Sequence, residues 1–306
     1  MINGIISVIV IFLIFSVGFW FTYRKLWPEN TTSILSVIVV TIGAPALAIY
    51  SISDRFTQEL LRASVTHIFI LILYTGLLFY TGKLFSKIMH LKEGKKNVFE
   101  VTFTFSNTIF IGLPINEIVF GHDGLPYLFT FYLVTLIGFW SLGAYKLAHS
   151  SPLHKKGFSL KKLISPGLIG VLIGILFVEF DLTIPYVFDS TLRYLGSLCV
   201  PLSLLVIGAN LVVFTKGIPK ITKDEYIILV GKFIISPIYM FVLLGLFHVE
   251  GLAFQVFMLT STMPCHMQTS ILAEYYNVES EYASKLVSLS TLISLITIPI
   301  FVSILS

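Results

Sequence analysis

Charged residues are scarce in this chain of 306 residues: Asp, Glu, Lys and Arg make up 12% of it, while apolar residues make up 56%. The mean hydropathy is +0.92, which excludes a soluble domain of ordinary composition. Short alternating segments typical of membrane β-barrels are lacking. Continuous apolar runs of about 20 residues recur instead, the length at which a helix crosses a hydrocarbon core. The composition predicts an all-α polytopic membrane protein.

Cysteine is nearly absent, and Cys199 and Cys265 both fall within apolar segments, so the sequence holds no disulfide framework. Enzyme motifs are missing too: there is no phosphate-binding loop, no His-Glu-x-x-His and no Gly-x-Ser-x-Gly. The histidines are scattered without the spacing of metal ligands. A net charge of +4 is too small to indicate nucleic acid. We expect no enzyme, no cofactor, no metal and no nucleic-acid partner.

The apolar runs predict ten membrane spans. Their approximate ranges are 1–23, 33–53, 65–85, 97–121, 124–146, 164–180, 190–214, 224–247, 252–275 and 284–305. The first lacks the positive flank and cleavage site of a secretory signal and is interpreted as a retained span. Sixteen of the twenty Lys and Arg residues lie in odd-numbered loops and three in even-numbered loops. By the positive-inside rule, the odd loops are cytoplasmic and both termini lie outside a cytoplasmic membrane.

The longest cytoplasmic loop divides the spans into five and five. Because each half has an odd number of spans, the second half enters the membrane in the opposite orientation, as an inverted repeat requires. Proline positions repeat as well: Pro45 in span two matches Pro201 in span seven, and Pro114 in span four matches Pro264 in span nine. The alternative is that prolines are simply common in membrane helices. The expected divisions are a first repeat at 1–146, a linker at 147–163 and a second repeat at 164–306.

Two of the predicted spans are interrupted near their middles. Asn107–Pro114 interrupts the fourth span, and Thr260–Gln268 interrupts the ninth. Proline has no amide hydrogen and crowds the carbonyl four residues before it, so we expect the fourth helix to break at Pro114, with Leu113 extended. Two spans broken at similar depth indicate the binding site of a transporter.

Neutral hydrogen-bonding side chains surround both breaks. Half-helix N-termini that point into a cavity suit an anion, so an anion is the expected ligand. The candidate substrate-binding residues are Asn107, Thr108, Gly112, Pro114, Asn116, Thr262, Pro264, His266, Gln268 and Thr269. Two of them have a structural alternative: Asn107 would instead bridge two helices, and His266 would pack or bond the backbone rather than titrate.

Lys232 is the one basic residue well inside a predicted span, at a cost of about 2.5–3.5 kcal/mol. Three roles are open: it balances a substrate's charge, pairs with a carboxylate in ion coupling, or extends its ammonium to the interface. Asn210 and His266 are the other candidates for a charge partner or a coupling role. Three acidic residues flank the broken spans and are expected at the membrane interface: Glu100, Glu117 and Glu274.

Gly170-Val-Leu-Ile-Gly174 in the sixth span is a motif for close helix packing. Such motifs more often join helices of one chain. Its alternative role is to join two copies in a homodimer.

Asn107-Thr-Ile-Phe-Ile-Gly-Leu-Pro114 resembles the Asn-x-x-x-x-Gly-x-Pro crossover of the auxin efflux carrier family. Pro264 with Ala273–Val278 is similar to that family's ninth-span crossover, and Ile207–Leu211 resembles its seventh span. The resemblance covers the whole chain. The family comprises the plant PIN carriers and bacterial permeases for small organic anions such as malate and malonate.

The resemblance implies a scaffold domain and a transport domain that cross at Pro114 and Pro264 and work by an elevator mechanism. Asn107 and the backbone near both crossovers would contact the carboxylate of malate, malonate or an auxin-like acid. Plant members carry a long cytoplasmic loop that is absent here, and an acidic residue early in span three, where this chain reads Ala63–His67 without a carboxylate. The coupling ion therefore stays open between a proton and sodium.

Two alternative functions share much of this pattern. A sodium-coupled symporter of the bile-acid-carrier type has the same ten-span inverted layout. A membrane sensor without flux is less favoured, because the chain has no soluble domain that would transmit a signal.

Overall fold

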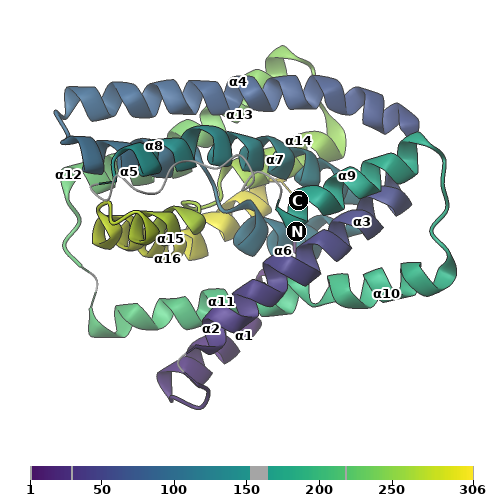
Figure 1. Ribbon diagram of the computed structural model, residues 1–306, viewed down its shortest axis with the longest axis horizontal. Helices are drawn as coiled ribbons and strands as arrows, with labels where there is room; N and C mark the ends of the chain where they lie inside the picture. The colour runs from purple at the N-terminus through teal and green to yellow at the C-terminus, as the bar shows by residue number, and fades with distance from the viewer. Residues whose placement is uncertain (1, 29, 152–164, 218, 306) are drawn as a thin grey trace.

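The computed structural model describes residues 2–28, 30–151, 165–217 and 219–305 (Figure 1). Every regular element in these ranges is helical, apart from one isolated antiparallel bridge between Ser106 and Cys265. The all-helical fold expected from the composition is therefore confirmed. The predicted linker 147–163 lies outside the described residues from position 152 onward.

The α-helices are α1 (Ile2–Tyr23), α2 (Thr31–Ile38), α3 (Ala44–Arg55), α4 (Gln58–Ile88), α5 (Glu93–Thr104), α6 (Leu113–Phe120), α7 (Leu125–Gly138), α8 (Ala144–His149), α9 (Pro166–Glu179), α10 (Tyr186–Ser197), α11 (Cys199–Asn210), α12 (Lys223–Val230), α13 (Ser236–Leu246), α14 (Gly251–Ser261), α15 (Gln268–Tyr275) and α16 (Ser280–Leu305). The π-turns are η1 (Val39–Gly43), η2 (Thr108–Gly112), η4 (Phe139–Gly143) and η7 (Gly231–Ile235). The 3₁₀ turns are η3 (His122–Gly124) and η6 (Leu211–Lys216).

Within the described residues, six helical stretches are long and apolar enough to cross a membrane. They are Thr31–Arg55, Gln58–Ile88, His122–His149, Tyr186–Thr215, Lys223–Leu246 and Ser280–Leu305. Shorter apolar helices are Ile9–Tyr23, Thr108–Phe120, Pro166–Glu179 and Gly251–Ser261. The count of ten spans and the five-plus-five repeat stay predictions.

Three of the π-turns stand directly before a residue–proline pair. η1 precedes Ala44-Pro45, η2 precedes Leu113-Pro114 and η7 precedes Ser236-Pro237. In a regular α-helix the proline ring collides with the carbonyl four residues back. A π-turn widens the helix by one residue, which displaces that carbonyl and lets the helix continue through the proline.

The prediction of a break at Pro114 with an extended Leu113 is therefore wrong. Leu113 is helical, with φ −64° and ψ −55°, and its amide donates to the carbonyl of Thr108 across η2. The interruption lies earlier in the chain: α5 ends at Thr104, and Phe105 is extended, with φ −92° and ψ 138°. Pro114 is the second residue of α6, directly after the wide turn η2.

The helices assort into two groups. In the first group, α1 and α2 pack on α11, and α3 packs on α9 and α10. In the second group, α4, α5, α7, α8 and α12 to α16 share one apolar core. Figure 1 shows α10 and α11 along the lower edge and α4 along the upper edge. η2 and α6 lie between the groups, against α1 and α11 on one side and α7 and α14 on the other.

Glycines allow the closest helix contacts in the first group. A Cβ added at Gly170 would lie 2.6 Å from the carbonyl oxygen of Pro45, and one at Gly174 would lie 2.8 Å from Cβ of Ile52. α9 therefore lies directly on α3. The Gly170–Gly174 motif joins two helices of this chain, so it gives no support to the predicted homodimer.

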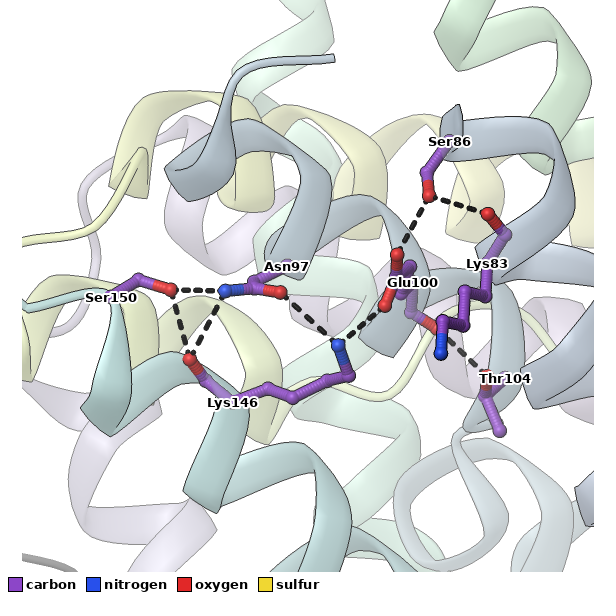
Figure 2. Close-up of polar contacts among 7 residues, drawn as sticks. All are labelled: Lys83, Ser86, Asn97, Glu100, Thr104, Lys146 and Ser150. Atoms are coloured by element: carbon purple, nitrogen blue, oxygen red, sulfur yellow. Dashed lines mark hydrogen bonds and ion pairs between the residues drawn. The ribbon is translucent and has the colours of Figure 1, made fainter. Parts of the chain in front are cut away.

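A buried ion pair fixes α5 against α4 and α8 (Figure 2). Oε2 of the fully buried Glu100 lies 2.5 Å from Nζ of Lys146, and its Oε1 accepts from the hydroxyl of Ser86 at 2.6 Å. Asn97 accepts from Nζ of Lys146 at 3.2 Å and donates to Ser150. Lys146 thus neutralises the charge of Glu100 inside the protein, and the expected position of Glu100 at the membrane interface stays a prediction.

Substitution of Gly170 by Val is expected to force α9 away from α3. Overpacking of this kind costs about 1–3 kcal/mol, so the temperature of thermal unfolding in detergent should fall. Gly76→Val is the matched control, because no atom lies within 4 Å of a Cβ added at Gly76. Equal shifts in the two variants would contradict the packing role of Gly170.

A double-mutant cycle tests the Glu100–Lys146 pair. Lys146→Met leaves a buried carboxylate without its cation, and we expect a loss of about 1–3 kcal/mol, since the Lys146 side chain is 22% exposed. The double variant Glu100→Gln/Lys146→Met should be more stable than the sum of the single effects implies. Thermal unfolding is measured for Lys146→Met, Glu100→Gln and the double variant. Strictly additive losses of stability would show that the pair is not coupled.

Candidate functional site

The two interruptions lie against each other and satisfy each other's backbone groups. The amide of Asn107 donates to the carbonyl of Pro264 at 2.8 Å, and the amide of His266 donates to the carbonyl of Phe105 at 3.2 Å. Ser106 and Cys265 form the antiparallel bridge between them. Backbone outside helices needs such partners in an apolar interior. We call residues 105–107 and 262–267 the crossover.

Lys232 in η7 supplies a cation to the crossover. Its side chain is fully buried, and Nζ donates to the carbonyl of Phe105 at 2.7 Å and to the hydroxyl of Ser106 at 3.1 Å. Complete burial excludes the extension of its ammonium to the interface. In the part of the chain that the structure describes, no carboxylate lies within ion-pair distance of Lys232. Of the three open roles, the balancing of a substrate's negative charge stays a prediction.

The side chain of Asn107 caps the helical turn that follows it and leaves one amide donor unused. Its Oδ1 accepts from the backbone amide of Phe110 at 3.2 Å, which caps η2. Nδ2 is buried and has no hydrogen-bond partner among the described residues. Asn107 is 3% exposed, so bulk water does not satisfy this donor. The free Nδ2 needs an acceptor that the protein does not supply.

Other unpartnered polar atoms gather at the second interruption. Within the described ranges, Nδ1 of His266, Oε1 of Gln268 and Oγ1 of Thr269 are buried without hydrogen-bond partners. Gln268 opens α15, so its first turn adds the partial positive charge of a helix N-terminus. The ring of His266 stacks on Phe139 with 4.4 Å between centroids. Buried polar groups are normally satisfied, so this cluster marks a site for a ligand or for water.

A small pocket is lined by Asn107, His266 and Gln268 but not by Thr269. Its lining residues are Val40, Ala44, Asn107, Ile109, Phe110, Tyr132, Leu136, His266, Met267 and Gln268. Its volume is about 20 Å³, which accommodates one water molecule. The pocket must widen before it holds a dicarboxylate. Val40 and Ala44 come from η1 and α3 of the first helix group, whereas Asn107 and His266 come from the crossover and Gln268 from the start of α15.

The remaining predicted site residues have structural contacts. Asn116 donates to the carbonyl of Gly112 at 2.7 Å and to the hydroxyl of Thr260 at 3.2 Å, which joins α6 to α14. Thr262 donates to the carbonyl of Leu259 at 2.7 Å at the end of α14. Thr108 donates to the carbonyl of Ser106 at 3.4 Å. None of these residues lines the pocket of about 20 Å³.

Asn210 lines a second, larger cavity of about 200 Å³ between the end of α11 and α16. Its polar lining also includes Ser270, Ser284, Ser288 and Thr291. Met267 lines both this cavity and the small pocket, so its side chain separates the two. Asn210 therefore does not line the crossover pocket, unlike Asn107, His266 and Gln268.

Sequence reasoning missed the apolar half of the pocket. Tyr132 and Leu136 of α7 and Val40 of η1 look like ordinary residues of apolar spans, and no local pattern distinguishes them. Ala44 had one usable sequence signal: it stands directly before Pro45. The turns η2 and η7 also end directly before a residue–proline pair.

The chain matches one family model, that of a membrane transport protein, over residues 3–156 and 151–302. It is 27% identical to an uncharacterized transporter of Methanocaldococcus jannaschii, over 96% of each chain. It is 25% identical to an uncharacterized transporter of Methanothermobacter thermautotrophicus, over 97% of this chain and 96% of that protein.

Removal of the charge of Lys232 is expected to weaken the binding of anions. Lys232→Met keeps most of the stem but removes the ammonium, so the affinity for malate should fall about tenfold. The measurement is the rise in unfolding temperature that malate produces in detergent-solubilised protein. Lys285→Met is the control, because Lys285 pairs with Glu225 at 2.8 Å, away from the pocket. A malate shift as large in Lys232→Met as in wild type would contradict this role.

Proposed function

The chain belongs to the membrane transport protein family, the family of the auxin efflux carriers, and on this premise we propose that it is a secondary transporter of a small organic anion. The protein is membrane-embedded and multi-pass, as its family and apolar helices require. The proposed substrates are carboxylates such as malate, malonate or an auxin-like acid.

One observation carries the choice of an anion: buried polar atoms without partners converge beside a cation and a helix N-terminus. Nδ2 of Asn107 is a free donor, Lys232 is positively charged, and α15 begins at Gln268. A carboxylate would accept from the amide of Asn107 and from the helix N-terminus. The ammonium of Lys232, held by the crossover backbone, would offset its charge.

The proposed topology is ten spans in two inverted halves with both termini outside. The six long and four shorter apolar helices correspond in order to the ten predicted spans. α5 with η2 and α6 would be span four, and α14 with α15 would be span nine, each interrupted at the crossover. The first helix group would then be the scaffold and the second group the transport domain.

An elevator motion accounts for the place of the pocket between the two groups. Val40 and Ala44 belong to the first group, while Asn107 and His266 would move with the second. Sliding of the second group would open the pocket to one side at a time. The cavity beside Asn210 would be the cytoplasmic branch of the path, with Met267 between the cavity and the pocket.

Lys232 favours a proton over sodium as the coupling ion. A sodium ion at the crossover would need carbonyl oxygens such as that of Phe105. The ammonium of Lys232 already binds this oxygen at 2.7 Å and would repel a second cation. We therefore propose proton coupling over the sodium-coupled alternative.

Substitution of Asn107 by Ala tests the site. Loss of a donor to a charged carboxylate costs about 1.5–3 kcal/mol, so the KM for malate should rise about 10–100-fold. The measurement is uptake of labelled malate into proteoliposomes with an imposed proton gradient, at matched protein content.

Asn30→Ala is the matched control, because Asn30 lies at the start of α2, is exposed, and its side chain makes no capping hydrogen bond. Its uptake should equal that of wild type. Unchanged uptake by Asn107→Ala would remove the first interruption from the substrate site. No uptake by wild type would discard malate, and malonate would be tested next.

A further inference from the structure

Glu117 is a carboxyl group that the proposed binding site does not use. It lies on α6, just after Asn116, about one helical turn before α6 ends at Phe120. Its side chain is 20% exposed, and its Oε2 is buried with no hydrogen-bond partner among the described residues. This carboxyl group is largely buried in the protein, and its expected position at the membrane interface stays a prediction. A buried carboxylate without a partner is costly in its charged form.

A single titratable neighbour connects Glu117 to the surface. Nδ1 of His122, in η3, lies 3.8 Å from Oε1 of Glu117, and the His122 side chain is 44% exposed. The ring of His122 also makes an edge contact with Tyr50 of α3, with 6.1 Å between centroids. A proton from water can therefore reach His122 first and the Glu117 carboxyl next.

The other titratable and charged groups around α6 are few. η3 adds Asp123, which pairs with Arg55 of α3 at 3.0 Å. α11 begins with the buried Cys199, which lies close enough to Glu117 for an electrostatic interaction. α7 brings Tyr127 and Tyr132, and the parts of α1 and α14 that pack on α6 bring no acidic or basic side chain. Among the described residues, His122 is thus the one basic group within ion-pair distance of Glu117.

Glu117 also lies at the boundary of the two helix groups. α6 packs against α1 and α11 of the first group, and η3 contacts Tyr50 and Arg55 of α3. A sliding motion of the second group would change these contacts and the access of water to Glu117. A group whose burial changes during the cycle changes its preference for a proton, which is what coupling requires.

We propose that Glu117 is the proton-coupling carboxyl of this transporter, with His122 as the relay to the outer surface; this rests on the proposed transport function. In each cycle the Glu117 carboxylate takes one proton from outside water through His122 and becomes a neutral carboxylic acid. After the second helix group has moved, the acid releases this proton to inside water and the carboxylate is restored. No bond other than O–H and N–H forms or breaks, and no electron is transferred.

The first test separates coupling from transport in proteoliposomes with the membrane potential clamped at zero: vesicles without internal malate report accumulation, and vesicles loaded with unlabelled malate report exchange. Wild type should accumulate malate about tenfold for a pH difference of about one unit, if one proton accompanies each anion. Glu117→Gln should lose this accumulation but still exchange labelled for unlabelled malate. Asp123→Asn, at an exposed residue of the same outer edge, should keep both activities. Accumulation by Glu117→Gln equal to wild type, with the same pH profile, would overturn the proposal.

A second measurement needs no substrate, so it tests Glu117 even if the Glu117→Gln variant does not transport malate. Infrared difference spectra of purified wild type between acidic and alkaline buffers should contain the carbonyl band of a buried protonated carboxyl. This band should disappear in Glu117→Gln and shift in Glu117→Asp, which keeps the titrating group. A band unchanged in Glu117→Gln would overturn the proposal whatever the transport result. Absence of malate transport by wild type, with the band assigned to Glu117, would instead discard malate as the substrate.

Discussion

The structure depends on one constraint: backbone that leaves a helix inside an apolar interior must find partners within the protein. The crossover meets it in two ways. Phe105 and Asn107 exchange backbone hydrogen bonds with Pro264 and His266, as paired strands do. Lys232 then adds a charged donor to the carbonyl of Phe105. Three side-chain atoms near the crossover are buried without hydrogen-bond partners among the described residues: Nδ2 of Asn107, Oε1 of Gln268 and Oγ1 of Thr269.

The two cavities differ in a way that fits alternating access. The pocket at the crossover holds about 20 Å³, whereas the cavity beside Asn210 holds about 200 Å³, and Met267 contributes to both walls. The conformation is therefore closed around the proposed substrate position and wider towards the end of α11. Met267 is a flexible side chain, suited to a wall that would yield in the proposed sliding motion.

Polar groups outside the crossover divide between structural and functional roles according to their partners. Glu100 has Lys146 and Ser86 as close partners, so its charge is neutralised in place and α5 is fixed. Glu117 has one buried oxygen without a hydrogen bond and a partly exposed histidine at 3.8 Å. Glu100 lies five residues before Phe105 and Glu117 ten residues after Asn107. The first is committed to packing, and our proposal assigns a change of charge to the second.

The sequence by itself determined the all-helical membrane class, the family and the segments around Pro114 and Pro264, because apolar length and proline chemistry are local properties. It also identified Asn107, His266 and Gln268, which line the pocket. It misplaced the first interruption, because a π-turn of five residues relieves the strain of Pro114 and no local rule predicts where that turn forms. Only the tertiary structure decided that Lys232 binds the crossover, that Glu100 pairs with Lys146, and that Val40 and Tyr132 complete the pocket. These contacts join residues far apart in the chain, and their partners are set by how the helices pack rather than by their sequence neighbours.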